Sequence, residues 1–286
     1  MGTSTAYSGP GGDTPLIPSW LEPDTAAPIP TNPPDLQSPD TVPQAPEDRP
    51  ALILPADPNR FRGVRTNLTK FARSGGTDKA SLGRAVSKYI SQASGGPRQA
   101  TLRMGASRQA GAALYSFLSS VQENGVRETL RQLNLESLAG RPINDVFLGL
   151  ADHICPDGGT VDEGIAREAF IETMVELTEQ GLTDLDALTP SQIQTVFEMF
   201  ATHAIEARLC NDIGTKTVMM PANAQAAIML QGQLRDFIRN GVSDALAKAL
   251  EETPVLTQNQ VLSFVDSVYE RAFGILQILG DTEANQ

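Results

Sequence analysis

Residues 257–279 read TQNQVLSFVDSVYERAFGILQIL, and this stretch carries the clearest periodic pattern in the chain. Its apolar residues step alternately by four and three from Val261 to Leu279, which is the spacing of one face of an α-helix. A second row flanks it at intervals of seven: Leu262, Tyr269 and Leu276. Thr257 and Gln260 have capping-box spacing at its start. The pattern predicts a core helix of an antiparallel bundle, with a seam for an oligomer or a partner helix as the alternative.

Helical signals recur upstream, and strand patterns bounded by turns are absent. Thr160 with Glu163 has capping-box spacing, and Thr189 precedes a proline and has Gln192 three residues on. Helices are expected to start at these two caps and to occupy residues 61–71, 78–93, 98–121, 124–134, 143–154, 222–250 (bent near Gly241) and 257–279. The predicted fold is therefore all-α, an irregular helical bundle preceded by a long disordered Pro-rich N-terminal tail.

Composition divides the chain into four segments. Fourteen of the twenty prolines lie at or before Pro58, where eight acidic residues accompany one Arg, so residues 1–58 are predicted to be a disordered Pro/Gly-rich tail. Residues 59–122 are predicted to be a basic helical neck, because eleven Lys or Arg and one acidic residue lie between Asn59 and Arg108. An acidic helical bundle is expected over 123–280 and a disordered end over 281–286.

The net charge, the cysteine count and the motifs of the chain argue against several classes of protein. A net charge of −12 disfavours general nucleic-acid binding, because most of the surface would repel a polyanion. Two cysteines, no secretory leader pattern and no apolar run long enough to span a bilayer predict a cytoplasmic protein without a membrane segment. No hydrolase or phosphate-binding motif appears. We therefore expect no enzymatic activity, no cofactor and no metal.

The basic neck is the first candidate binding site. Its first cations lie around Phe61 and Phe71, and others follow within the predicted helix 98–121. The candidates are Arg60, Arg62, Arg65, Lys70, Arg73, Arg98, Arg103 and Arg108. The favoured interpretation is pairing with acidic protein surface, either the chain's own or a partner's. The alternative is contact with the phosphates of a nucleic acid.

Two further groups of residues have the chemistry of a binding site but not its spacing. The chain has only two His and two Cys, namely His153, Cys155, His203 and Cys210, and their spacing does not match a zinc site. The cysteines are expected to be small buried residues at helix ends, with both histidines near the surface. An acidic row, Glu168, Glu172, Glu176 and Glu179, is expected to be a solvated face or an electrostatic docking face.

Several stretches, taken in order, resemble one bacterial family. They are Met1-Gly2-Thr3-Ser4-Thr5, the Gly- and Pro-rich run through Trp20, Arg60-Phe61-Arg62-Gly63, and Arg103-Met104-Gly105 before Ala110-Gly111-Ala112. This order of features resembles QatB, the small helical component of the Qat anti-phage operon. The other components of that operon are an ATPase (QatA), a QueC-like enzyme (QatC) and a TatD-like nuclease (QatD).

The resemblance implies a role for the tail. QueC-type enzymes activate a 7-deazaguanine carboxylate with ATP and pass it to an amine, and the family relationship implies that the QueC-like partner uses a protein N-terminus. That amine would belong to Gly2 after removal of Met1. Thr3, Ser4 and Thr5 would contact the entry groove, and an apolar anchor is expected at Leu16, Ile17, Trp20 and Leu21. The ATPase and the nuclease are further expected partners.

Overall fold

The computed structural model describes residues 57, 59–156, 158–181, 184–214, 223–253 and 256–285, which belong to one compact unit, Pro55–Gln286. These residues form ten α-helices and no strand, which confirms the predicted all-α fold. The helices are α1 (Arg62–Arg73), α2 (Lys79–Lys88), α3 (Pro97–Leu102), α4 (Gly105–Asn124), α5 (Val126–Gln132), α6 (Ile143–Ile154), α7 (Val161–Glu179), α8 (Pro190–Ile213), α9 (Ala224–Glu252) and α10 (Val261–Ala284). Short turns of other helix types occur at Tyr89–Ala93, Glu136–Leu138 and Gln258–Gln260. The predicted tail, residues 1–56 and Pro58, lies outside the described residues.

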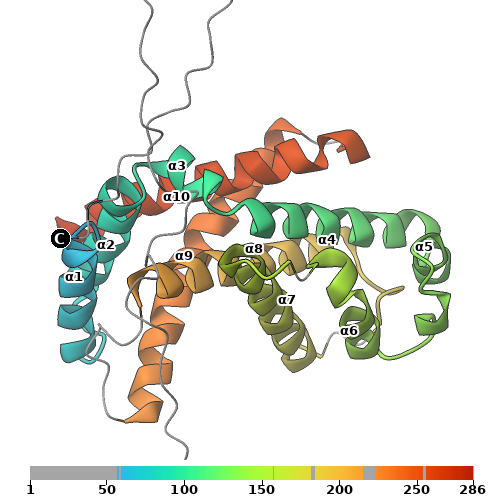
Figure 1. Cartoon of the computed structure of the whole chain (residues 1–286), viewed down its shortest axis with the longest axis horizontal. Coiled ribbons are helices and arrows are strands. Elements are labelled where there is room, and N and C mark those ends of the chain that lie inside the picture. The colour runs from blue at the N-terminus through green and yellow to red at the C-terminus, as the bar shows by residue number, and fades with distance from the viewer. Residues whose placement is uncertain are drawn as a thin grey trace, which may run out of the picture. The chain divides into compact units, whose positions relative to one another are not determined.

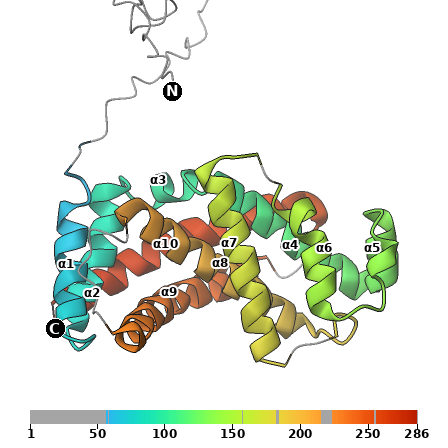
Figure 2. The same cartoon turned by 60° about the horizontal axis from the view of Figure 1, so that its bottom comes forward.

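The helices of this unit form two groups joined by the long helices α8, α9 and α10. In both views α1 and α2 lie side by side at one end, and α5 and α6 lie at the other end (Figures 1 and 2). The C-terminus returns to the end occupied by α1 and α2. The Arg84 guanidinium fixes it there by donating to the carbonyl of Ala284 at 3.0 Å.

Helix α10 is a core helix, as its periodic pattern predicts. Val265, Val268 and Ala272 are fully buried, and Tyr269 and Leu276 of the flanking row are buried beside them. Leu262, the first member of that row, is instead 47% exposed. The buried face lies against α2, α3, α4 and α9.

Glycines allow α2 and α10 to pack at backbone contact. A Cβ atom added to Gly280 would lie 2.5 Å from the carbonyl oxygen of Gly83, and one added to Gly83 would lie 2.7 Å from the carbonyl oxygen of Gly280. Gly241 on α9 also lies close to α10, but against a side chain, since its Cβ would lie 2.6 Å from the Leu276 side chain. These three glycines let the helix axes approach more closely than larger residues permit.

The helix starts predicted from local capping signals are present. Thr160 and Glu163 form a capping box at α7, and Thr189 and Gln192 form another at α8. The Thr257 box is also formed, and a short 3-10 turn separates it from α10. Each box supplies hydrogen bonds to N–H groups that an isolated helix start leaves without partners.

Two helix boundaries differ from the prediction. The single helix expected over 98–121 is broken between α3 and α4, because Asp162 of α7 accepts a hydrogen bond from the Ala106 N–H at 2.7 Å and so caps a new helix start. The prediction of a disordered end over 281–286 is wrong for most of that segment, since α10 continues to Ala284. Asp281 accepts a hydrogen bond from the Ser87 hydroxyl there, at 2.6 Å.

The basic neck and the acidic body are not structurally separate. Helices α1 and α2 lie in the same compact unit as the rest of the described chain, and α2 packs along α10. The charge boundary near residue 122 falls inside α4.

Within the described residues, no helix is both long enough and apolar enough to cross a bilayer.

Candidate functional site

The tail residues predicted to act in modification and partner binding lie outside the described residues. They are Gly2, Thr3, Ser4, Thr5, Leu16, Ile17, Trp20 and Leu21. The remaining candidates, the basic residues of the neck, are all described and can be placed individually.

Four of the eight candidate cations of the basic neck are only partly exposed. Arg108 of α4 forms an ion pair with Asp266 of α10 at 2.5 Å, and only 17% of its side chain is exposed. Arg65 of α1 donates to the carbonyl of Ile213 at 2.9 Å, and Arg103 donates to that of Ala93 at 3.5 Å. Arg60 lies over the ring of its neighbour Phe61, at 4.7 Å from the ring centroid. Arg108 therefore pairs with an acidic residue of the chain's own body.

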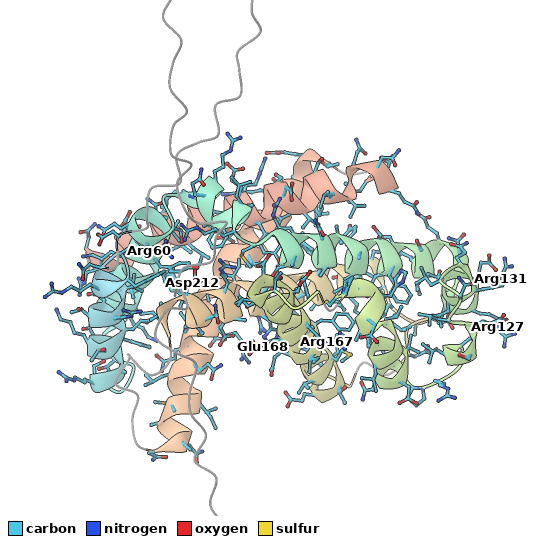
Figure 3. All side chains as sticks on the ribbon, in the orientation of Figure 1. Arg60, Arg127, Arg131, Arg167, Glu168 and Asp212 are labelled. Carbon is cyan, nitrogen blue, oxygen red and sulfur yellow. The ribbon has the colours of Figure 1, made fainter. Side chains whose placement is uncertain are left out.

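The other four candidate cations of the neck are exposed. Arg62, Lys70 and Arg73 lie at spacings of eight and three residues along α1, which places them on one side of that helix. Arg98 is exposed on α3. Figure 3 places Arg60 near the α1 end of the unit, whereas Arg127 and Arg131 lie at the opposite end, on α5. The arginines of the described chain are thus spread along the unit.

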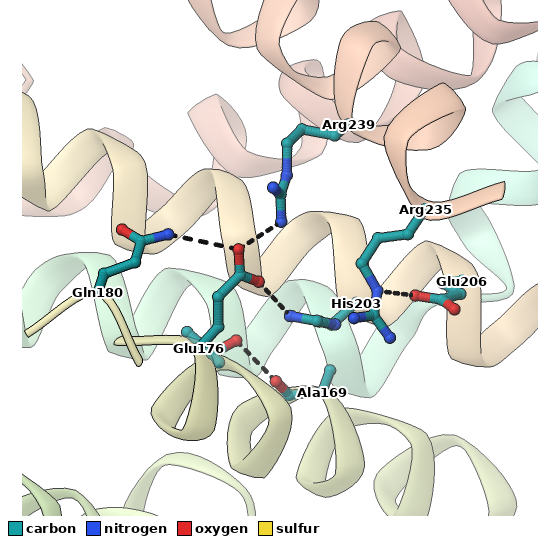
Figure 4. A network of polar contacts seen from close by, with 8 residues as sticks. Ala169, Glu176, Gln180, His203, Glu206, Arg235 and Arg239 are labelled. Carbon is teal, nitrogen blue, oxygen red and sulfur yellow. Dashed lines mark hydrogen bonds and ion pairs between the residues drawn. The ribbon is translucent and has the colours of Figure 1, made fainter. Parts of the chain in front are cut away.

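A polar network that the sequence did not predict joins α7, α8 and α9. Glu176 accepts from Nε2 of His203 at 2.9 Å, and its other oxygen pairs with Arg239 at 2.7 Å. Beside them, Arg235 pairs with Glu206 at 2.6 Å. Figure 4 shows Glu176 between His203 and Arg239, with the second pair one helical turn away. The network fixes the relative positions of three helices.

His203 is buried, which corrects the expectation that both histidines lie near the surface. Only 3% of its surface is exposed, whereas His153 is exposed. Burial, with the nearby Arg235 guanidinium, lowers the pKa of His203 below its ordinary value despite the contact with Glu176. At neutral pH the ring is therefore uncharged, and it donates to Glu176 with the proton on Nε2.

Stability should depend on pH through this histidine. The pKa of His203 is lower in the folded protein than the value of 6.5 that it takes when unfolded. As pH falls below that value the unfolded chain takes up the proton first, so the free energy of unfolding should decrease. A His203→Gln variant keeps a donor to Glu176 and does not titrate, so its stability should fall less between about pH 7.5 and about pH 5.5.

Urea unfolding of both proteins at the two pH values measures this difference. His153→Gln is the matched control for the substitution itself, because His153 is exposed and lies outside the network. Equal pH dependence of the wild-type protein and His203→Gln would contradict a depressed pKa.

Glu176 also corrects the prediction for the acidic row of α7. Its side chain is 17% exposed, accepts a hydrogen bond from His203 and forms an ion pair with Arg239, so it stabilises the helix interface. The other three members, Glu168, Glu172 and Glu179, are exposed, as a solvated or docking face requires.

The two cysteines are held as neutral thiols. Cys155 is buried and donates to the carbonyl of Ala166 at 3.6 Å, and Cys210 is half-buried on α8. Burial raises the pKa of each to about 12, with the Glu206 and Glu168 carboxylates adding to the effect at Cys210. Among the described residues, no three His, Cys, Asp or Glu side chains are arranged to hold a metal ion.

Two adjoining cavities lie beside this network. An apolar cavity of about 240 Å³ is lined by side chains of α1, α8 and α9, including Leu68, Phe71 and Leu230. A polar cavity of about 100 Å³ lies between α7, α8 and α9, with His203, Glu206 and Arg235 in its walls. Glu168, Cys210 and Gln231 line both cavities, so the two are direct neighbours, and together they are called the groove below.

The fold and these contacts define an all-helical protein whose charged interior groups hold helices together. The chain belongs to the QatB family: residues 95–276, more than half of its length, match the model described as "Qat anti-phage system associated protein QatB". No curated protein and no solved structure matches the chain. Of the stretches that resemble the family, those around Met104 and Gly111 lie inside the matched range, and Met1–Trp20 and Arg60–Gly63 lie outside it.

Proposed function

We propose that this protein is a non-enzymatic adaptor and modification substrate of an anti-phage complex. In this proposal the helical unit docks partner proteins, and the N-terminal amine of Gly2 is presented to a QueC-like enzyme. The observation that carries the proposal is membership of the QatB family. In this proposal Met1 is removed, which leaves Gly2 with a free α-amine.

The chemistry of an N-terminal glycine suits acyl transfer. An α-amino group has a pKa of about 7.7 to 8.0, so an appreciable fraction is the neutral nucleophile at neutral pH, whereas a lysine near 10.4 is almost wholly protonated. The amine of Gly2 would attack the acyl carbon of an ATP-activated 7-deazaguanine carboxylate. An amide bond forms, the activating group leaves with its electron pair, and the amine loses a proton. Glycine has no side chain to obstruct this approach.

The length of the tail suits delivery of that amine. If residues 1–57 behave as a flexible chain, their r.m.s. span is roughly 40 Å. Such a span lets the tail reach a partner's active site while the helical unit stays docked. Thr3, Ser4 and Thr5 offer hydroxyl groups for hydrogen bonds along an entry groove, and Leu16, Ile17 and Trp20 offer an apolar anchor.

Intact mass after co-expression with the QueC-like protein tests the proposal. We expect the N-terminal peptide to gain the mass of the 7-deazaguanine acid less one water, on Gly2. Co-expression with a catalytically inactive partner is the control and should leave the peptide unchanged. An unmodified N-terminus beside a partner shown to be active would defeat the modification hypothesis.

The exposed cations of α1 support a second candidate function, nucleic-acid binding. Arg62, Lys70 and Arg73 lie on one side of the helix, where they can approach phosphates. The net charge of −12 opposes this function over the surface as a whole. Binding of short DNA or RNA that weakens steeply with salt, and that is lost when these three residues become Glu, would favour it.

A further inference from the structure

The groove formed by the two cavities combines an apolar end with a negatively charged end. Leu68, Phe71, Leu209, Ile213, Leu230 and Leu234 line the apolar end. Its volume of about 240 Å³ is larger than the roughly 150 Å³ that admits a benzene molecule in an engineered protein cavity. This end can therefore receive an aliphatic or aromatic side chain.

The polar end carries an excess of negative charge. Its walls hold the carboxylates of Glu168, Glu172 and Glu206 and a single guanidinium, that of Arg235. Neither Glu168 nor Glu172 forms a salt bridge with any residue that the structure describes. The nearby histidine is uncharged at neutral pH, so it does not offset this excess.

One acceptor atom at this end lacks a partner. The side chain of Glu206 is 5% exposed, and its Oε2 pairs with Arg235. Its other oxygen, Oε1, is buried and has no hydrogen-bond partner among the described residues. Leaving a buried carboxylate oxygen without a donor costs free energy, and a cationic donor that came within hydrogen-bond distance of Oε1 would recover it.

We propose that this groove binds a segment of a partner protein that inserts an apolar side chain beside Leu230 and places a Lys or Arg against Glu168, Glu172 and Glu206. The chain's own tail is disfavoured by its charge, because residues 1–58 carry eight acidic residues and one Arg, and that residue, Arg49, directly follows Glu47 and Asp48. The inference does not rest on modification of Gly2.

Selection from a ribosome-displayed library of random peptides of about twelve residues, with the full-length chain as bait, tests the partner's chemistry. Enriched peptides should pair a large apolar residue with a Lys or Arg a few positions away. Fluorescence anisotropy of the consensus peptide then gives its Kd. A consensus without such a pair, or no enrichment, would overturn the proposal.

Matched charge reversals locate the binding site. Glu168→Lys with Glu172→Lys should weaken binding of the consensus peptide by at least about tenfold. Glu123→Lys with Glu179→Lys changes the net charge equally at exposed positions that do not line the groove, and it should leave the Kd within about twofold. An equal loss of peptide affinity in both double variants would overturn the proposal, because it would indicate that the peptide is attracted to the whole acidic surface.

The apolar end and the competing occupants are tested with the same peptide. Cys210→Phe places a larger side chain where the two cavities meet and should also weaken binding; if it lowers the thermal midpoint, the charge reversals alone decide. Displacement of the probe by a synthetic peptide of residues 45–58 would assign the groove to the chain's own tail. Self-association that is lost in Glu168→Lys with Glu172→Lys would assign it to a second copy. Either result would overturn the proposal of a partner protein.

Discussion

Deleting residues 1–20 should abolish phage resistance while leaving the helical unit folded. The deletion removes the Gly2 amine and the apolar residues Leu16, Ile17 and Trp20. The helices of the described unit pack on one another through core residues of their own, so its thermal unfolding midpoint should not change. Efficiency of plating on cells that carry the complete operon, with and without the deletion, measures the effect. We expect plating to return to the level of cells without the operon.

Point changes at Gly2 distinguish a chemical role from a purely structural one. Gly2→Ala still permits removal of Met1 and presents a small primary amine, so resistance should be retained. Gly2→Leu retains Met1, because a bulky second residue blocks its removal, and resistance should be lost. Full resistance after deletion of residues 1–20 would contradict the adaptor proposal. It would favour the basic neck as the functional element.

Gly280→Ala should destabilise the helical unit, whereas Gly274→Ala on the same helix should not. At position 280 the new Cβ would lie 2.5 Å from the Gly83 carbonyl oxygen and 3.0 Å from Cβ of Ser87. A backbone oxygen cannot rotate away, so α2 and α10 must separate. Their separation also weakens the hydrogen bond from Ser87 to Asp281. We expect the free energy of unfolding to fall by about 1 to 3 kcal/mol.

Gly274 provides the matched control for that substitution. No atom lies within 4 Å of the position that its Cβ would occupy. Alanine is favoured over glycine inside a helix, so Gly274→Ala should raise the free energy of unfolding by up to about 1 kcal/mol. Thermal or urea unfolding of the two variants and the wild type measures both effects. Equal midpoints for Gly280→Ala and Gly274→Ala would contradict close packing of α2 against α10.

The sequence predicted the helix starts that are capped by nearby residues. It could not predict the starts that are capped by residues far away in the chain. Capping boxes at Thr160 and Thr189 lie within four residues of the groups that they satisfy, so the sequence shows both partners together. The start of α4 is capped by Asp162, which is 56 residues away in the chain. The start of α5 is capped in the same way, because Asp186 accepts from the Val126 N–H at 2.9 Å over 60 residues. No local pattern indicates either contact.

The candidate site shows the same division. The sequence identified the cations of the neck and the acidic row of α7 as groups of charges, and three members of that acidic row are exposed. It did not indicate that Glu176 would turn inward to His203 and Arg239, because these residues come from three different helices. The apolar and polar cavities also went unpredicted, since residues of α1, α7, α8 and α9 meet there only after folding.

The sequence by itself determined the all-α class, most of the helix starts and the uneven distribution of charge. Caps, prolines and apolar periodicity act within one or two helical turns, so they can be read from neighbouring residues. Tertiary structure alone decided which glycines lie at helix contacts, which histidine is buried and which carboxylates are paired. Those outcomes depend on surfaces supplied by distant segments, as where Gly280 meets Gly83 almost two hundred residues away.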